Sequence, residues 1–493
     1  MKVLRQFLAI AGGAMALTAA TADTASATQP AWQDYFTEVS KAWYIPVYYP
    51  GRGQSNITTA VVDLNGDGRK DIVLHLYAHR YDNGETGTKP AFNKMVLMIQ
   101  QANGRFVDET KNYLIGSRDL GGVSRKVKIG DLNGDGRPDL VYAVNQEDGR
   151  NFPNAHYADA QLAAVISVPG GYKVTRFGRP NWYHSVNIGQ DASGRSFAMG
   201  EGFSQPSAQY GESFYFDANG AAIATGLQLP TVSAGSFEIY NKGGLAFKSD
   251  TILQGGSSYP NYYAAEGFRL VSSAGAGTWS KLTSLAFGTV VGTANLLYPG
   301  NPNPAPGPVL NIRGKNIFGG AIFENCRIHM QPGAAPSVVF HLGAGLLPDF
   351  YEGITVKQSD LKPFSTFVAA RVAGDKIVPV TLNLRREVQI DNNVNFFDCK
   401  DVNADGYEDL VVYPYGSQVQ VYLNGPTRRF EYQGTGPFPP ITDVWQYSAT
   451  TILEDMDGDG IADLLVFPAN GMPDQLTGRV PCRLYKGKKQ LGT

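Results

Sequence analysis

The stretch GDLNGDGRPDLVYA, residues 130–143, contains three aspartates, an asparagine and two glycines in the nine residues after Gly130. It continues directly into Leu-Val-Tyr-Ala, which has the composition of a buried strand. Three carboxylates held in one tight turn repel each other and lose hydration on folding. A bound cation would turn the same cluster into a rigid clip, so the stretch predicts a metal-binding turn that leads into a core strand.

The pattern D-x-[DN]-x-D-G-x-x-D occurs four times: DLNGDGRKD (63–71), DLNGDGRPD (131–139), DVNADGYED (401–409) and DMDGDGIAD (455–463). An apolar segment follows each copy: IVLHLYA, LVYAV, LVVYP and LLVFP. A metal-free Asp/Asn/Gly turn would explain one copy but not four. We therefore predict four calcium sites.

Ca²⁺ takes six to eight oxygen ligands, and oxygens at positions 1, 3 and 5 converge when a glycine at position 6 permits a tight turn. Position 7 offers its backbone carbonyl. An EF-hand needs a glutamate at position 12, whereas these loops have Leu74, Tyr142, Val412 and Val466 there and an aspartate at position 9. The predicted metal-binding residues are Asp63, Asn65, Asp67, Arg69, Asp71, Asp131, Asn133, Asp135, Arg137, Asp139, Asp401, Asn403, Asp405, Tyr407, Asp409, Asp455, Asp457, Asp459, Ile461 and Asp463.

These loops resemble the calcium loops of FG-GAP/VCBS repeats, which build the integrin α-subunit propeller and many bacterial secreted proteins. The segments 96–110 and 419–433 are similar to the strand-turn-Phe pattern that closes such repeats. The resemblance is specific at the four loops and weak from about residue 200 to 390. The Phe-Gly and Gly-Ala-Pro elements are mostly absent, so integrin-like function is not implied.

The resemblance implies an all-β propeller, and the composition agrees. With 57 Gly, 29 Pro and only 17% charged residues, the chain suits many short strands joined by turns. The first two loops begin 68 residues apart and the last two 54 apart, and residues 186–200 are similar to a loop that has lost most of its carboxylates. These spacings predict a seven-bladed propeller in one domain, residues 28–493, with calcium loops in four blades.

Residues 1–27 have the basic start, apolar run and Ala-Ser-Ala end of a secretory signal peptide, which predicts a secreted or periplasmic protein. No later stretch has about 18 consecutive apolar residues, so no membrane span is expected. Three cysteines leave two alternatives open: three small buried residues, which we favour, or a bridge between Cys399 and Cys482.

The aromatic segment at residues 32–51 precedes the first repeat. The last blade ends soon after residue 482, so we expect its outermost strand to come from elsewhere, and this segment could supply it. Alternatively, Trp32, Trp43, Tyr48 and Tyr49 could form a platform on which sugars stack. We favour ring closure, because aromatic side chains bury large areas.

The resemblance places each calcium loop between the first and second strands of a blade, on one face. Seven residues of the second strand cover about 23 Å, so the connection after it lies on the opposite face. These connections begin at His79, Asn145 and Pro468 and are long for hairpins, and long loops on rigid scaffolds often carry function. The predicted ligand-binding residues there are His79, Arg80, Tyr81, Asp82, Arg150, Asn151, His156 and Tyr157. His75 and Tyr77 precede them, and we expect both to pack within a strand face.

The four loops contain thirteen aspartates while the whole chain has a net charge of −2, so the rest of the chain is basic overall. This balance favours an anionic glycan or cell-envelope partner. Nucleic acid is excluded as a partner by the lack of Arg/Lys runs and of a binding motif.

We expect a monomeric binding or adhesion module for carbohydrate or a cell-surface protein, with structural Ca²⁺ and no catalysis. The alternative is a polysaccharide lyase or glycosidase on the same scaffold, with His79, Arg80, His156, Tyr157 and His184 as candidate residues.

Overall fold

The computed structural model describes residues 31–39, 47–48, 55–78, 81–82, 85–86, 92–145, 160–181, 183–191, 193–202, 212–226, 237–240, 245–250, 262–270, 279–281, 285–289, 310–312, 315–317, 321–344, 364–374, 376–384, 394–414, 418–427, 429–434, 436–439, 449–468, 479–480 and 483–492. The predicted signal peptide lies outside these ranges. Apart from two four-residue helices, α1 (Trp32–Tyr35) and α2 (Thr110–Tyr113), the described elements are strands.

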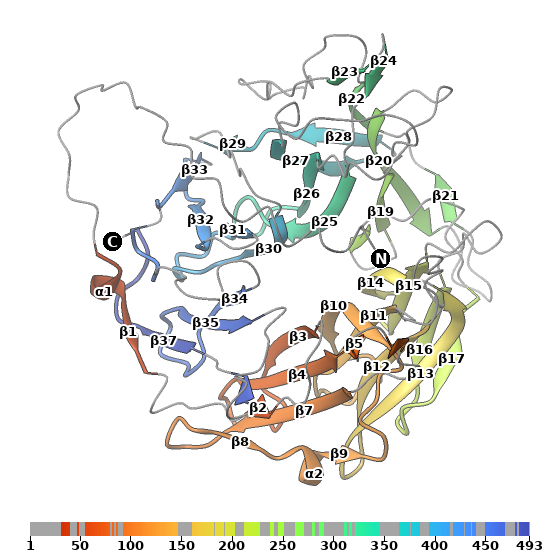
Figure 1. Ribbon diagram of the computed structural model, residues 1–493. Coiled ribbons are helices and arrows are strands. Elements are labelled where there is room, and N and C mark those ends of the chain that lie inside the picture. Colours follow the sequence, from red (N-terminus) through yellow and green to blue (C-terminus); the bar gives the residue numbers. More distant parts are fainter. Residues whose placement is uncertain are drawn as a thin grey trace.

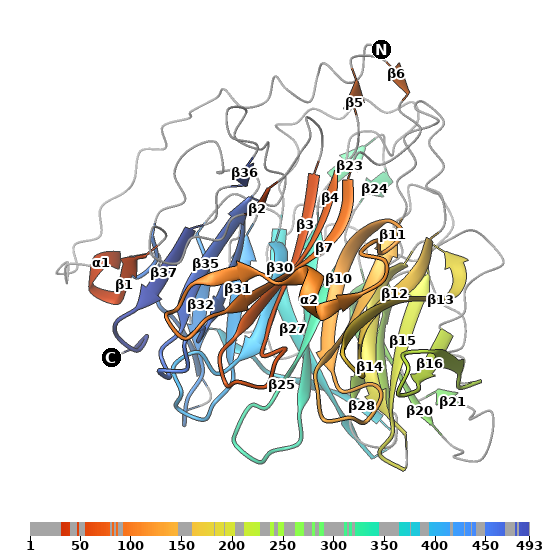
Figure 2. The same cartoon turned by 90° about the horizontal axis from the view of Figure 1, so that it is seen from below.

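The strands form seven sheets of four or five strands, which Figure 1 shows arranged around a ring and Figure 2 shows from the side. The first sheet is β3 (Ser55–Val62), β4 (Asp71–Ala78), β7 (Phe92–Gln100) and β8 (Phe106–Asp108). The second is β10 (Val123–Gly130), β11 (Asp139–Asn145), β12 (Ala160–Val168) and β13 (Gly171–Asn181), with β9 (Leu114–Ile115) parallel to β13. The third is β14 (Tyr183–Gln190), β15 (Ser196–Gly202), β16 (Glu212–Phe216) and β17 (Ala222–Ala224).

The fourth sheet is β18 (Phe237–Tyr240), β19 (Leu245–Asp250), β20 (Tyr262–Leu270) and β21 (Trp279–Lys281), and β22 (Leu285–Thr289) also pairs with β20. The fifth is β25 (Ala321–Ile328), β26 (Ser337–Ala344), β27 (Phe364–Ala373) and β28 (Lys376–Val380). The sixth is β30 (Val394–Lys400), β31 (Asp409–Pro414), β32 (Gln420–Leu423) and β33 (Arg429–Tyr432), with β29 (Asn383–Leu384) parallel to β33. The seventh is β34 (Ala449–Glu454), β35 (Asp463–Pro468), β37 (Arg483–Gly487) and β1 (Phe36–Glu38).

Three further sheets have two strands each: β2 (Val47–Tyr48) with β36 (Arg479–Val480), β5 (Tyr81–Asp82) with β6 (Glu85–Thr86), and β23 (Leu310–Ile312) with β24 (Lys315–Ile317). Within each large sheet, consecutive strands pair antiparallel, and the first strands of neighbouring sheets contact each other from β3 and β10 round to β25 and β30. This arrangement confirms the prediction of an all-β propeller.

The core lies between the sheets, which pack face to face around the ring. The second strands of the first, second, sixth and seventh sheets have described residues buried on both faces, in agreement with their apolar sequences. Ile72 packs with Leu465 of the seventh sheet, and Val73 packs with Tyr142 of the second sheet. The buried side chains come from six of the seven large sheets; the fourth sheet is described by its backbone.

A strand from near the start of the chain completes the seventh sheet. Phe36 in β1 stands opposite Gly487 in β37, in an antiparallel pair. Trp32 packs edge-on against Tyr485, with ring centroids 5.7 Å apart. The prediction that the aromatic segment closes the ring is confirmed for residues 32–38.

These contacts bury Trp32 partly in the core. Tyr48 lies in β2, whereas Trp43 and Tyr49 fall outside the described residues.

Cys326 in β25 and Cys399 in β30 form a disulfide, with Cα atoms 5.6 Å apart. The alternative of a Cys399–Cys482 bridge was therefore wrong, and two of the three cysteines expected as small buried residues are bonded to each other. The reason is the packing of β25 beside β30 in neighbouring sheets, which brings together cysteines 73 residues apart. Such a bridge indicates an oxidising compartment outside the cytoplasm. The described part of the chain contains no helix of sufficient length and apolar character to span a membrane.

Candidate functional site

The four Asp-rich loops each connect the first and second strands of a large sheet, in the first, second, sixth and seventh sheets. We call residues 63–71, 131–139, 401–409 and 455–463 the first, second, third and fourth loops. The first and fourth loops touch, since the Lys70 N–H donates to the Met456 carbonyl at 3.4 Å. The loops therefore occupy the predicted place in the chain.

The backbone of each loop turns through left-handed conformations. The position 6 glycines have φ between 82° and 87°. Position 4 is also a glycine with positive φ in three loops, but in the third loop it is Ala404, with φ 56°. Ala404 is the single residue other than glycine with positive φ in the described ranges. These conformations bring the side chains of positions 1, 3 and 5 to the same side of the turn.

The first aspartate of each loop organises the turn by accepting backbone N–H groups. Its Oδ2 accepts the N–H of the position 6 glycine at 2.8–2.9 Å in all four loops. Its Oδ1 accepts the N–H of position 4 at 2.7–2.8 Å in the first, second and fourth loops. Position 5 likewise accepts the N–H of position 7 at 2.9 Å in every loop.

The position 9 aspartate connects the loop to the third strand of its sheet, and it is fully buried in all four loops. Its Oδ2 accepts the N–H of position 2 at 2.7–3.0 Å. Its Oδ1 accepts an N–H from the end of the third strand at 2.7–2.8 Å. The donors at the third strand are Gln100, Ser167, Asn424 and Gly487.

Burial disfavours the charge on these aspartates. It raises the pKa of Asp71 to about 6 and those of Asp409 and Asp463 to about 7, although backbone N–H groups oppose the shift. It also raises the pKa of Asp139. Neighbouring carboxylates, such as Asp67 beside Asp71, add to the increase. A cation in the loop would favour the ionised form and reverse this effect.

The second oxygen of the position 5 aspartate faces a donor or cation in every loop. Asp67 Oδ2 contacts Arg69, and Asp135 Oδ2 accepts a hydrogen bond from Ser167 Oγ at 2.8 Å. Asp405 Oδ2 accepts from Asn403 Nδ2 at 3.3 Å, and Asp459 Oδ2 lies 3.3 Å from an ammonium, discussed below. This oxygen therefore accepts a hydrogen bond or forms an ion pair in each loop.

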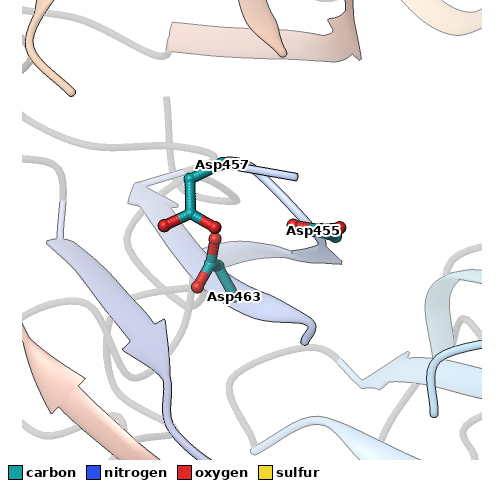
Figure 3. A group of neighbouring side chains, drawn as sticks. All are labelled: Asp455, Asp457 and Asp463. Atoms are coloured by element: carbon teal, nitrogen blue, oxygen red, sulfur yellow. The ribbon is translucent and has the colours of Figure 1, made fainter. Parts of the chain in front are cut away.

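The fourth loop brings its carboxylates closest together. Asp455, Asp457 and Asp463 each offer an oxygen, and these oxygens all lie within 4.8 Å of one another. Figure 3 shows the three side chains. Hard oxygen donors of this kind suit Ca²⁺. The donor chemistry of the loops therefore fits a calcium ion, and the triad could hold a metal.

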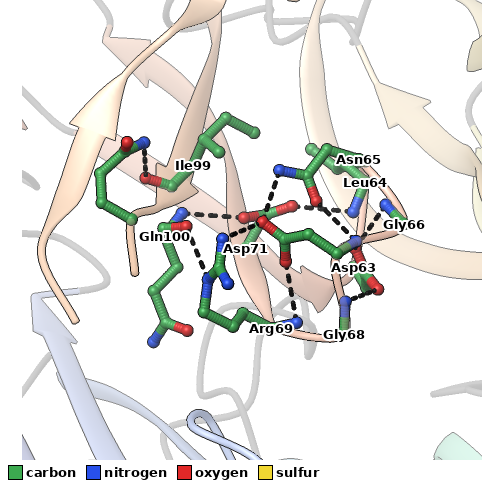
Figure 4. A network of polar contacts seen from close by, with 11 residues as sticks. Asp63, Leu64, Asn65, Gly66, Gly68, Arg69, Asp71, Ile99 and Gln100 are labelled. Atoms are coloured by element: carbon green, nitrogen blue, oxygen red, sulfur yellow. Dashed lines mark hydrogen bonds and ion pairs between the residues drawn. The ribbon is translucent and has the colours of Figure 1, made fainter. Parts of the chain in front are cut away.

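The first loop borders a polar cavity of about 490 Å³. Figure 4 shows Arg69 lying between the loop and β7, where its Nε donates to the Gln100 carbonyl at 3.2 Å. The cavity is lined from the loop by Asn65, Asp67 and Arg69 and from the far wall by Gln101, Glu109 and Tyr113. Polar side chains thus also line a cavity beside an Asp-rich loop, a location that the sequence reasoning missed.

The turn of the third sheet occupies the place predicted for a loop that has lost its carboxylates. Its single aspartate, Asp191, accepts hydrogen bonds from Ser193 Oγ at 2.6 Å and from the Tyr215 hydroxyl at 2.8 Å. Arg195 stacks on the Tyr215 ring at 4.1 Å. Side chains thus satisfy this carboxylate, which lacks the companion carboxylates of the four loops.

Six of the predicted ligand-binding residues fall outside the described residues: His79, Arg80, Arg150, Asn151, His156 and Tyr157. Tyr81 and Asp82 form β5, a short strand paired with β6. His75 is buried, with Nδ1 2.6 Å from Ser124 Oγ and Nε2 2.8 Å from Asn93 Oδ1. His75 is thus a packed core residue, as expected.

The structure also identifies Ser167 and Lys486 as neighbours of the loop carboxylates. Both come from the third strands of their sheets, and the sequence pattern of the loops gave no sign of them. Only an alignment of the third strands with one another could have identified them, and the variable connections between the strands hide that alignment.

Residues 401–466 match a family model described as an FG-GAP-like repeat. The match begins at the third loop and ends in β35, just after the fourth loop. This part of the chain is therefore an FG-GAP-like repeat, as the loop pattern predicted. A comparison with curated proteins found no match.

Several solved structures resemble the chain at low identity. A Bacillus licheniformis rhamnogalacturonan lyase has 10% identity and a TM-score of 0.37, with 90% of this chain and 75% of that chain covered. An α-L-arabinofuranosidase from Fusarium graminearum has 10% identity and a TM-score of 0.35, with 74% and 93% covered. The β-propeller domain of the Trilobed protease from Pyrococcus furiosus has 10% identity and a TM-score of 0.31, with 88% and 99% covered.

Proposed function

We propose that this chain, with its FG-GAP-like repeat at residues 401–466, is an exported, calcium-stabilised propeller of seven blades that acts as a binding module. The observation that carries the proposal is the hydrogen-bond pattern shared by the four loops, which presents carboxylate or amide oxygens at positions 1, 3, 5 and 9. The seven large sheets support the blade count, and the disulfide supports export to the periplasm or the cell exterior.

Calcium would have a structural role in each loop. The oxygens of positions 1, 3, 5 and 9 and the carbonyl of position 7 would hold it, and it would supply positive charge to a crowded set of carboxylates. The position 9 aspartate is already bonded to the third strand. A bound ion would therefore link the first hairpin of the sheet to that strand.

The partner we propose is a carbohydrate or a cell-surface protein. We propose that this protein binds it as a monomer and that residues 28–493 form one domain. The proposed surface is the face opposite the calcium loops, with His79, Arg80, Tyr81, Asp82, Arg150, Asn151, His156 and Tyr157. β4 and β11 have eight and seven residues, so the connections after them begin about 23–26 Å from the loops. The basic balance outside the loops favours an anionic glycan.

Calcium dependence is the first test. Calcium in millimolar excess should raise the melting temperature of the protein, and a chelator should reverse the increase. The double variant Asp67→Asn/Asp135→Asn should lose much of the increase while retaining ligand binding on the far face. An unchanged melting temperature in calcium and in chelator would refute the calcium proposal.

A glycan array together with an absorbance screen for uronate cleavage tests the binding proposal. Binding without turnover supports a binding module. The appearance of unsaturated sugar ends would instead identify a polysaccharide lyase, and release of reducing ends without unsaturation would identify a glycosidase. If the protein showed no binding and no turnover on a broad array, the assignment of a glycan partner would be overturned.

A further inference from the structure

The fourth loop carries one more aspartate than the other three. Its third position is Asp457, whereas the corresponding residues are Asn65, Asn133 and Asn403. Four aspartates in one nine-residue loop repel each other more strongly than three, and no basic residue lies in the loop itself because position 7 is Ile461. The extra charge therefore needs a partner from elsewhere.

Lys486 in β37 provides that partner. Its Nζ contacts Asp457 Oδ2 directly and lies 3.3 Å from Asp459 Oδ2. The lysine is positioned by its neighbour, because the Gly487 N–H donates to the buried Asp463 Oδ1 at 2.7 Å. The ammonium is therefore held over the loop by the same strand that anchors the loop.

The corresponding position in the other three sheets is apolar. The residues that precede the N–H donors Gln100, Ser167 and Asn424 are Ile99, Ile166 and Leu423, and all three are buried in the core. The lysine thus occurs in the sheet whose loop has the additional aspartate. These paired differences indicate that Lys486 and Asp457 function together.

We infer that Lys486 is a tethered counter-ion that occupies the carboxylates of the fourth loop and competes with calcium for them. The inference rests on the proposed calcium binding. Without the metal, the ammonium offsets the extra carboxylate and keeps the loop folded against β37. When calcium binds, Asp457 and Asp459 turn to the ion, and the ammonium leaves for solvent on its flexible stem.

Competition gives Lys486 opposite effects on two measurable quantities. Its removal should destabilise the metal-free protein, since the fourth loop then has four unbalanced carboxylates. The same change should tighten calcium binding at this loop by about three- to tenfold, because no positive charge must be displaced and none remains near the ion. If Lys486 had a purely structural role, its removal would lower both the stability of the metal-free protein and the calcium affinity of the fourth loop.

The test uses the full chain with Lys486→Met, which keeps an unbranched apolar stem of nearly the same length and removes the charge. The matched control is Lys376→Met, which removes an exposed lysine from β28 in the fifth sheet. Thermal unfolding in chelator measures metal-free stability, and calorimetric calcium titration measures affinity. The double variant Asp457→Asn/Lys486→Met gives the fourth loop the same pattern as the others and should recover metal-free stability.

We expect Lys486→Met to lower the melting temperature in chelator and to tighten one calcium site, with Lys376→Met unchanged in both. Equal or weaker calcium binding by Lys486→Met would overturn the inference, while wild-type protein that still binds calcium would leave the proposed function intact. Wild-type protein that binds no calcium would defeat the proposed function itself. Failure of the double variant to recover stability would show that Lys486 does not balance Asp457.

Discussion

The Tyr172 hydroxyl donates a hydrogen bond of 2.8 Å to the backbone carbonyl of Leu64 across 108 residues of chain. The guanidinium of Arg137 lies over the same tyrosine ring, 4.6 Å from its centroid. Leu64 belongs to the first loop and Arg137 to the second. One buried side chain of β13 therefore connects two of the proposed calcium loops.

Replacing Tyr172 with Phe should lower the free energy of unfolding by about 1–2 kcal/mol, because the buried Leu64 carbonyl loses its donor. Urea unfolding measures the change. Tyr142→Phe is the matched control: this hydroxyl is also buried in the second sheet, but it has no hydrogen-bond partner within the described ranges. Its removal should be neutral or stabilising, so equal losses in both variants would contradict the assignment.

Ala404→Gly should stabilise the third loop by up to about 1 kcal/mol, because a left-handed conformation strains any residue with a Cβ atom. The reverse change, Gly134→Ala in the second loop, should destabilise by a similar amount. An added Cβ there would meet no atom within 4 Å, so the cost is confined to the backbone. Thermal unfolding checks both, and shifts of the same sign in the two variants would contradict the explanation.

Acid should destabilise the first sheet through His75. Burial lowers the pKa of His75 to about 4, from 6.5 in the unfolded chain, although the charge of Asp119 partly opposes the shift. Between these values the unfolded chain binds a proton and the folded chain does not. The neutral His75 side chain therefore contributes about 3 kcal/mol to the free energy of unfolding above pH 6.5. This contribution is lost as the pH falls to about 4.

His75→Gln should remove this dependence while keeping an amide near Ser124 and Asn93. The difference in stability between wild type and variant should shrink from pH 7 to pH 4.5, while the aspartates contribute equally to both proteins. A constant difference would show that His75 does not titrate in this range.

Removing the disulfide between the fifth and sixth sheets should lower the stability of the protein. The bridge closes a chain segment of 73 residues, and loss of such a cross-link costs about 4 kcal/mol in the chain-entropy view. Cys326→Ala/Cys399→Ala should therefore lower the melting temperature by several degrees. Cys482→Ala serves as the control, because Cys482 is not part of this bridge.

The Asp-rich loops could be predicted because their pattern is local: every proposed ligand lies within nine consecutive residues. The anchoring of those loops could not be predicted from the same pattern. Asp71 accepts the N–H of Gln100, which lies 29 residues further along the chain. Asp409 accepts the N–H of Asn424, which lies only 15 residues further along. No fixed spacing identifies these partners.

The pairing of the cysteines could not be predicted from the sequence for a related reason. Cys326 and Cys399 meet because two first strands are neighbours in the ring, and that relationship depends on the number and order of sheets. The predicted far-face residues remain predictions, because most of them lie outside the described ranges. What the sequence defined well was the repeated turn and the strand after it.

The pairing of Phe36 with Gly487 also affects the order in which the strands can pair during synthesis. The partner of β1 is synthesised some 450 residues after it, so this early segment waits for nearly the whole chain to emerge. Until then the nascent protein is an open arc, with β37 yet to be made and an unpaired edge available to chaperones. The pairing of β1 with β37 therefore forms only after the strands of the first six sheets have been synthesised.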